Sequence, residues 1–258
     1  MVTMTINGKR VQAQEGEMLL AVLRRLQIEV PALCHHEAVE PFGACRLCTV
    51  EITKKSWNGW KNHVTSCLYP VEEGLIVQTH SSEVVEIRRN ILDLLLASSP
   101  YSGVIQELAA EYGVDSCSFE VDPEGDDCIL CGLCTRVCDA LGMKAITTVD
   151  RGKKKIIDTP FSKASADCIG CTICAQVCPT GHIKFREHGK QRNIWYQDFK
   201  MATCTECGRS LDITTAMVTY FSDRQQLPED YFELCTECKQ HQTVAKFNTI
   251  IDRSEEVF

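Results

Sequence analysis

The chain has 258 residues, enough for one large domain or several small ones, and its net charge of −8 argues against nucleic acid as a partner. The 17 cysteines allow two explanations, disulfides or metal sites, but residues 1–9 are polar and lack the apolar core of a signal peptide. Because no apolar run is long enough to span a bilayer, we expect a cytoplasmic protein with reduced thiols and no membrane span.

The N-terminal segment is predicted to form a small mixed sheet with one helix packed on it. Residues 2–6 alternate between apolar and polar, and the turn signal Asn7-Gly8 follows them, so a hairpin is expected here. Apolar residues then repeat at helical spacing over 18–26, which indicates the helix. The segment therefore reads as a compact α+β unit that precedes most of the cysteines.

The first cysteine constellation has the spacing C-x10-C-x2-C-x18-C. Four thiolates are the number of ligands that a [2Fe–2S] cluster needs, and the C-x2-C pair can direct two sulfurs at one iron. Gly43 and Ala44 precede this pair and keep the side chains small where backbone N–H groups would face the cluster. Four buried free thiols or a structural zinc are the alternatives. The proposed [2Fe–2S] ligands are Cys34, Cys45, Cys48 and Cys67.

Residues 81–120 read as a helical connector. Apolar residues at helical spacing over 84–95 predict a helix of about four turns, and 104–112 predict a shorter one. Cys117 follows these helices outside any metal-ligand spacing, so it is interpreted as a buried or free thiol. Between the two cysteine runs that come next, 145–158 is predicted to be a hairpin.

Two runs of the form C-x2-C-x2-C-x3-C follow, and they are the most specific signal in the chain. The first three cysteines of such a run surround three corners of a cubane, and the fourth binds the other cluster. One [4Fe–4S] cluster is therefore assigned to Cys128, Cys131, Cys134 and Cys178. The other is assigned to Cys138, Cys168, Cys171 and Cys174. Zinc is the weaker alternative, because eight cysteines in this order fit a two-cluster ferredoxin better.

The last four cysteines form two C-x2-C pairs separated by 27 residues. Gly208 follows the first pair, as in a zinc knuckle, where glycine lets the backbone turn beneath the metal. The separation is long for a zinc ribbon, so a third [4Fe–4S] cluster stays open as an alternative. We expect one Zn²⁺ bound by Cys204, Cys207, Cys235 and Cys238.

These motifs resemble a known family. Residues 15–23 and 28–34 are similar to the β-grasp ferredoxin domain that opens the large iron–sulfur subunit of respiratory complex I and the small diaphorase subunit of NAD-reducing, in some cases electron-bifurcating, hydrogenases. Residues 107–114 resemble the connector of those diaphorase subunits. The relatives usually carry one more cluster, held by one histidine and three cysteines. Residues 97–103, where that site would lie, contain neither residue type, so that cluster is expected to be absent.

The expected fold class is α+β, with four parts. They are a β-grasp [2Fe–2S] ferredoxin domain at 1–80, a helical connector at 81–120, a 2×[4Fe–4S] ferredoxin domain at 121–187, and a C-terminal four-cysteine, zinc-ribbon-like module at 188–258.

The resemblance implies an electron-transfer subunit without a catalytic centre of its own, acting in a hetero-oligomer. Its expected partners are a flavin- and NAD(P)-binding diaphorase subunit and a catalytic hydrogenase or other dehydrogenase subunit, with no nucleic acid and no membrane contact. The chain itself has neither a GxGxxG motif nor a P-loop. Two alternatives are the iron–sulfur subunit of a fumarate reductase or succinate dehydrogenase and a stand-alone ferredoxin-type carrier.

Overall fold

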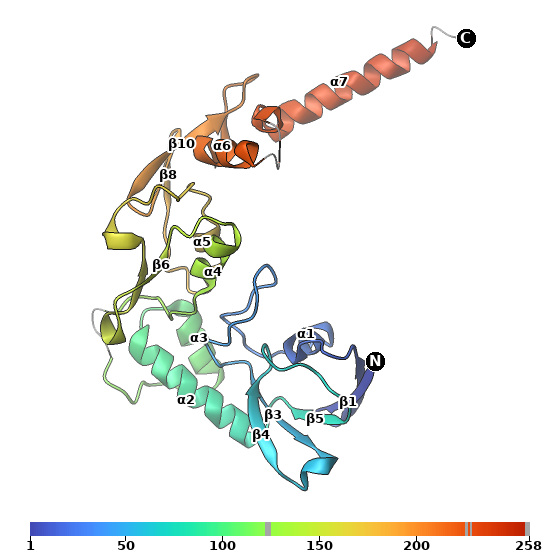
Figure 1. Ribbon diagram of the computed structural model, residues 1–258, viewed down its shortest axis with the longest axis vertical. Coiled ribbons are helices and arrows are strands. Elements are labelled where there is room, and N and C mark those ends of the chain that lie inside the picture. The colour runs from blue at the N-terminus through green and yellow to red at the C-terminus, as the bar shows by residue number, and fades with distance from the viewer. Residues whose placement is uncertain (122–124, 225–226, 228, 256–258) are drawn as a thin grey trace.

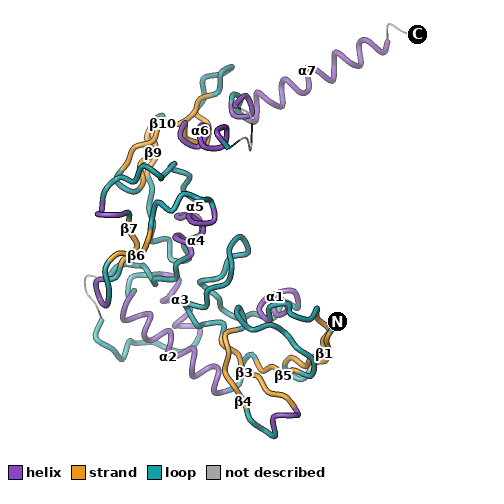
Figure 2. Tube along the Cα trace, in the orientation of Figure 1, coloured by secondary structure: helices purple, strands orange, loops and turns teal. Residues whose placement is uncertain are grey.

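The computed structural model describes residues 1–121, 125–224, 227 and 229–255. The chain follows an extended arc, with an N-terminal sheet at one end and a long C-terminal helix projecting from the other (Figure 1). Within the described residues, no helix combines the length and the apolar character that crossing a bilayer requires. Long loops link the short helices and strands in the middle of the arc (Figure 2).

The N-terminal sheet has five strands in the order β2-β1-β5-β3-β4. β1 and β5 are parallel, and the other neighbours are antiparallel. Asn7 and Gly8 adopt left-handed φ values of 49° and 81°, which confirms the predicted hairpin turn between β1 and β2. Helix α1 packs its apolar face on the sheet. The elements are β1 (Val2–Ile6), β2 (Lys9–Ala13), α1 (Leu19–Arg25), β3 (Thr49–Lys54), a 3₁₀ turn (Lys55–Trp57), β4 (Lys61–Thr65) and β5 (Leu75–Gln78).

Two helices follow the sheet, as the apolar periodicity predicted: α2 (Ser82–Ser98) and α3 (Gly103–Glu111). Arg88 of α2 is fully buried and donates hydrogen bonds to the Leu47 and Thr49 carbonyls at 3.0 and 2.9 Å. It also donates to the Tyr112 hydroxyl at 3.0 Å, beyond the end of α3. A buried guanidinium with three partners therefore joins both helices to the loop that carries Cys45 and Cys48.

The middle of the chain contains two short helices, each placed within a cysteine run, and one hairpin. β6 and β7 pair as predicted, with Thr147 opposite Asp158. The elements are α4 (Leu133–Ala140), β6 (Thr147–Val149), β7 (Ile156–Asp158), α5 (Ile173–Gln176) and 3₁₀ turns at Gly152–Lys154 and Pro160–Ser162. The mixed α and β content that the sequence predicted is confirmed here and in the sheet.

The C-terminal part contains a four-stranded antiparallel sheet in the order β11-β10-β9-β8, followed by helices. Its elements are β8 (Arg186–His188), β9 (Gln191–Ile194), β10 (Gln197–Thr203), β11 (Ser210–Thr214), α6 (Thr215–Asp223), a 3₁₀ turn (Glu229–Phe232) and α7 (Thr236–Glu255). Most of α7 extends away from the rest of the chain (Figure 1).

Candidate metal centres

The first four cysteines lie at the buried ends of the loops beside the N-terminal sheet, with exposed fractions between 1% and 7%. The Cys45 N–H donates to the Cys34 sulfur at 3.4 Å. A hydrogen bond from the Cys45 thiol lowers the pKa of Cys34 to about 5, and one from Cys67 lowers the pKa of Cys48 to about 6. The thiols thus meet as the pairs Cys34/Cys45 and Cys48/Cys67.

This pairing differs from the expectation that the C-x2-C residues Cys45 and Cys48 share one iron. Arg46, between them, has a φ of 58°, so the chain turns sharply after Cys45. Cys48 lies directly before β3, beside Cys67 and Leu20 in a separate apolar cluster. Each thiol of the C-x2-C unit therefore has a different nearest partner, contributed by a distant part of the sequence.

The backbone around Cys34 fits a large anionic group. Backbone N–H groups of Ala44 and Cys45 donate to the Cys34 sulfur. Gly43 has a φ of 70°, and a Cβ built there would lie 2.5 Å from Leu68 Cδ1, so only glycine is accommodated without a shift. The small side chains predicted at 43–44 therefore allow the loop to present its N–H groups to the sulfurs.

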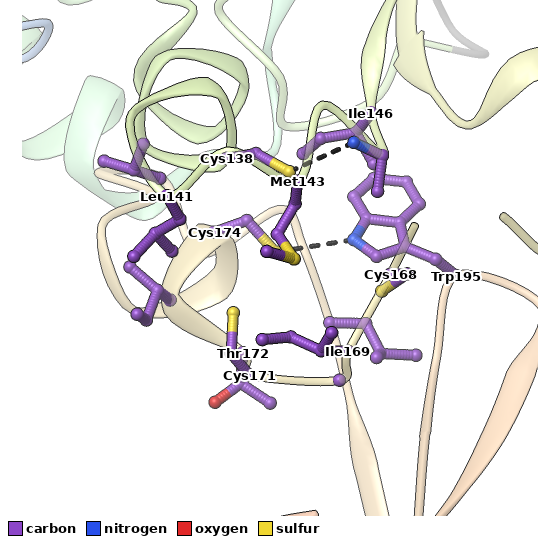
Figure 3. Close-up of a pocket in the computed structure, with 15 residues that line it drawn as sticks. Cys138, Leu141, Met143, Ile146, Cys168, Ile169, Cys171, Thr172, Cys174 and Trp195 are labelled. Atoms are coloured by element: carbon purple, nitrogen blue, oxygen red, sulfur yellow. Dashed lines mark hydrogen bonds between the residues drawn. The ribbon is translucent and has the colours of Figure 1, made fainter. Parts of the chain in front are cut away.

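The two cysteine runs in the middle of the chain line two separate pockets. One is lined by Cys128, Cys131, Cys134 and Cys178. The other is lined by Cys138, Cys168, Cys171 and Cys174 (Figure 3). The fourth cysteine of each run thus faces the pocket of the other run, as the spacing led us to expect.

The two runs also share one backbone pattern. Leu130 and Gly132 in the first run have φ values of 50° and 69°, and Gly170 and Thr172 in the second have 68° and 62°. Alternating left-handed residues make consecutive N–H groups converge on one side of the chain, which creates an anion-binding concavity. In each run these loops donate backbone hydrogen bonds to the first two cysteine sulfurs. The internal repeat of the sequence is therefore also a repeat of conformation.

The burial of the cysteines in these pockets favours metal-bound thiolates over metal-free thiols. All 17 cysteines are free, and burial raises the pKa of Cys128 to about 11 and of Cys134 and Cys174 to about 12. Burial of several thiolates together is unfavourable without a cation, whereas metal ions bind the deprotonated form and offset that cost. Both pockets combine clustered thiols with inward-facing N–H groups, which are the features that an iron–sulfur cluster requires.

The sulfurs of the four C-terminal cysteines lie closer to one another than those of the other three cysteine groups. Their sulfurs all lie within 4.8 Å of one another, and Cys207 Sγ is 3.7 Å from Cys235 Sγ. Cys204 and Cys207 follow β10, while Cys235 and Cys238 lie at the beginning of α7. Hydrogen bonding from the Cys207 N–H lowers the pKa of Cys204 to about 6. This set fits a single small cation bound by four thiolates.

Cys117, the cysteine outside these spacings, donates its thiol hydrogen to the Asp93 carbonyl at 3.4 Å. It lies outside the four groups of cysteines described above, and its interpretation as a buried or free thiol stays a prediction.

Sequence reasoning missed Arg136, which lies between Cys134 and Cys138 on α4. Its guanidinium donates to the Cys34 carbonyl at 2.7 Å and to the Glu40 carbonyl at 2.6 Å, and it lies 5.3 Å from the centre of the Phe42 ring. A charged residue inside a cysteine run was the available signal, but its partners are about a hundred residues away. Arg136 thus joins the first cysteine site to the adjacent pocket.

Trp195 was also missed. It lies in the turn between β9 and β10, and its indole N–H donates to Cys174 Sγ at 3.4 Å (Figure 3). The backbone N–H of Ala145 likewise donates to Cys138 Sγ at 3.3 Å. An aromatic residue in a turn outside the cysteine runs gave no sequence signal for this contact.

Comparison with known proteins identifies two kinds of domain in the chain. Residues 1–82 match the model of a 2Fe-2S iron-sulfur cluster binding domain. Residues 127–181 and 167–213 each match the model of a 4Fe-4S dicluster domain. The second match includes Cys204 and Cys207. The chain therefore carries [2Fe–2S]- and [4Fe–4S]-binding domains, as the cysteine spacings predicted.

Similar proteins include the NADPH-Fe(3+) oxidoreductase subunit alpha of Geobacter sulfurreducens, which is 31% identical over 62% of this chain and 21% of its own length. The NADP-reducing hydrogenase subunit HndD of Solidesulfovibrio fructosivorans is 29% identical over 65% of this chain and 33% of its own. The mitochondrial NADH-ubiquinone oxidoreductase 78 kDa subunit of Neurospora crassa is 26% identical over 75% of this chain and 29% of its own length. This chain thus spans about a fifth to a third of the length of these relatives.

A solved structure is also similar, the crystal structure of an NAD⁺-reducing [NiFe]-hydrogenase in the H₂-reduced state. The match has a TM-score of 0.60 at 26% identity and covers 70% of this chain and 86% of that chain. The resemblance inferred from the sequence is confirmed: the chain is an iron–sulfur protein related to subunits of NAD(P)-linked hydrogenases and of NADH-ubiquinone oxidoreductases.

Proposed function

We propose that this chain relays electrons through iron–sulfur clusters between a flavin- and NAD(P)-binding subunit and a catalytic hydrogenase or other dehydrogenase subunit. The observation that carries the proposal is the continuity of the three cysteine sites. Cys34 and Cys45 share one apolar cluster with Cys131, and Cys134 shares the next with Cys174. A line of adjacent redox sites without intervening solvent is what a relay needs.

The proposed ligands follow the groups of thiols described above. Cys34, Cys45, Cys48 and Cys67 would hold a [2Fe–2S] cluster. Cys128, Cys131, Cys134 and Cys178 would hold one [4Fe–4S] cluster, and Cys138, Cys168, Cys171 and Cys174 the other. When bound, such clusters supply one-electron oxidation and reduction. The chain's own groups orient them, exclude water and donate N–H hydrogen bonds to the sulfurs.

The proposed domain boundaries lie between these sites. The β-grasp domain at 1–80 would end where β5 ends at Gln78, and the connector at 81–120 contains α2 and α3. The two-cluster domain at 121–187 contains both pockets. The module at 188–258 contains most of the C-terminal sheet and the four clustered cysteines.

The flavin would come from a partner. NAD(P)H gives up two electrons as a hydride, whereas iron–sulfur clusters accept one electron at a time, so a flavin must act between them. The names of the relatives link them to NADH, NADPH or hydrogen, which favours this assignment over the succinate dehydrogenase and stand-alone alternatives. A cytoplasmic location is part of the proposal, since thiols there stay reduced and available to metal.

The C-terminal site is proposed to hold one Zn²⁺ in a docking module. Four thiolates in a tetrahedron around zinc, with Zn–S of about 2.3 Å, lie ~3.8 Å from one another. The distance of 3.7 Å between the Cys207 and Cys235 sulfurs supports this size of ion. A cubane holds its sulfurs at four separate iron corners and needs wider spacing, so a third [4Fe–4S] cluster is the less favoured alternative.

Metal analysis and electron paramagnetic resonance of anaerobically purified chain test the assignments. We expect about ten irons and one zinc per chain, together with one [2Fe–2S] and two [4Fe–4S] signals after dithionite reduction. Iron near fourteen without zinc would replace zinc with a third [4Fe–4S] cluster. Iron near six would remove one [4Fe–4S] site from the relay, and iron near two would remove both.

A further inference from the structure

A basic segment stands out on this acidic chain. Residues 144–200 contain eleven Lys and Arg against five Asp and Glu, while the rest of the chain has sixteen against thirty. Within this region, residues 151–163 contain five basic residues, all exposed, and one acid, Asp158, which is buried. Among the ion pairs of the described residues, none involves a basic side chain of 151–163. Their charge therefore faces solvent.

Exposed aromatic rings accompany this charge. Tyr196 is 60% exposed and Phe161 is 89% exposed. The Tyr196 hydroxyl donates to Asp158 Oδ2 at 3.1 Å and has a side-chain hydrogen bond with Ser162. Because Asp158 ends β7 and Ser162 neighbours Phe161, the β9–β10 turn meets the basic segment. We call residues 151–163 together with Trp195 and Tyr196 the basic aromatic surface.

The loops that form this surface are held in unfavourable conformations. Phe161 and Ser162 have φ values of 60° and 51°, and Trp195 and Tyr196 have 50° and 62°. Bulky residues avoid the left-handed region, because their side chains crowd the backbone there. Backbone strain in two adjacent loops that display aromatic rings points to a surface maintained for binding.

The surface is directly linked to a metal pocket. Trp195 lines the pocket of Cys138, Cys168, Cys171 and Cys174, and its indole N–H bonds to the Cys174 sulfur (Figure 3). The next residue, Tyr196, is exposed. Trp195, which belongs to the basic aromatic surface, therefore contacts a thiol of this site directly, so this surface offers a short route between the site and an external protein.

We propose that the basic aromatic surface docks an acidic electron-carrier protein of the ferredoxin type, which exchanges electrons with the chain at the site beside Cys174. This inference rests on the relay function proposed above. Opposite charges on two proteins steer their encounter and raise the association rate by about 10- to 1,000-fold at low salt. A long polyanion such as nucleic acid is a poorer fit, because the rest of the chain is strongly acidic.

The test measures electron transfer to cluster-loaded chain. A small acidic ferredoxin with two [4Fe–4S] clusters, reduced beforehand, serves as the probe in stopped-flow mixing at about 20 and about 300 mM NaCl, which span weak and strong screening. The variant K153E/K154E/K163E reverses charge on the surface. We expect its second-order rate constant to fall about tenfold or more at low salt, and the difference to shrink at high salt.

A matched variant, K9E/R10E/K55E, makes the same change in net charge on exposed residues of the N-terminal sheet. It should change the rate less than about twofold, because those residues lie far from the proposed contact. Equal slowing of both variants would show that net charge alone acts, and would overturn the proposal. Unchanged rates in both would overturn it too.

Failure of this inference can be told apart from failure of the relay. All variants are first checked for iron content and for reduction by dithionite, which needs no docking. Chain that dithionite reduces, yet whose ferredoxin rate is insensitive to the surface charges, refutes the docking surface and leaves the relay intact. Chain that assembles no reducible clusters refutes the relay itself.

Discussion

Replacing Arg136 with glutamine should loosen the contact between the first cysteine site and its neighbour. The guanidinium forms two hydrogen bonds that link distant parts of the chain, to the carbonyls of Cys34 and Glu40, and it lies against the Phe42 ring. The side chain is partly exposed, so each bond contributes about 1 kcal/mol and the ring contact about 0.5–1 kcal/mol. The loss is therefore about 2–3 kcal/mol.

That loss should appear as local opening of the loop that carries Cys34 and Cys45. A change of about 2–3 kcal/mol in opening free energy corresponds to about 30- to 150-fold faster amide exchange. Hydrogen exchange read by mass spectrometry on peptides covering residues 32–45 measures it directly. Lysine at 136 should give an intermediate result, because a single ammonium group lacks the planar fork that reaches both carbonyls.

The control is Arg151→Gln, which removes an exposed charge that makes no ion pair with any described residue. Exchange in the loop should not change in this variant. If exchange in the loop is also unchanged in the Arg136→Gln protein, with the cluster retained, then the guanidinium does not hold the two sites together and the reasoning fails.

Three further predictions concern single cysteines and their neighbours. Cys178→Ala should damage the cluster assigned to Cys134 and spare the one assigned to Cys174, as seen by electron paramagnetic resonance; the opposite pattern would reverse the cross-ligation. Trp195→Phe removes an N–H donor that favours the more negative, reduced state, so the potential at Cys174 should fall by ~20–45 mV in a redox titration, and a rise would contradict this. The pKa of the metal-free Cys204 thiol is lowered to about 6, and bound zinc holds a thiolate deprotonated below its metal-free pKa; zinc should therefore stay bound at neutral pH and leave only as the pH falls below about 6, measured with a chromogenic chelator, and release at pH 7 would argue against a four-thiolate zinc site.

The sequence was most informative where ligands lie close together along the chain. The spacing of the two cysteine runs predicted which residues share each pocket, because a short run cannot reach the fourth corner of its own cubane. The pairing within the first site was not predictable in the same way. Cys34 and Cys67 approach Cys45 and Cys48 through the folding of the sheet, and the left-handed turn at Arg46 separates the two thiols of the C-x2-C unit.

Contacts between distant segments also could not be predicted from the sequence. Arg136 resembles an ordinary exposed helix residue until its partner carbonyl at Cys34 is known. Trp195 lies in a turn, and the local sequence pattern does not predict its hydrogen bond to Cys174 Sγ. Arg88 is similar, since an arginine on an amphipathic helix is normally solvated, yet here it is fully buried against the Leu47 carbonyl. Local periodicity predicts elements, whereas these residues act through tertiary packing.

The relay itself is tested most directly by adding a pyridine nucleotide to anaerobic, cluster-loaded chain and following the visible absorption of the clusters. The chain alone should be bleached by dithionite but not by NADH or NADPH, and it should not reduce a dye with either nucleotide, because a hydride donor needs a flavin to split its electron pair. Addition of the flavin-bearing partner subunit should allow NADH or NADPH to bleach the clusters. Oxidation of either nucleotide by the purified chain without flavin would contradict the account.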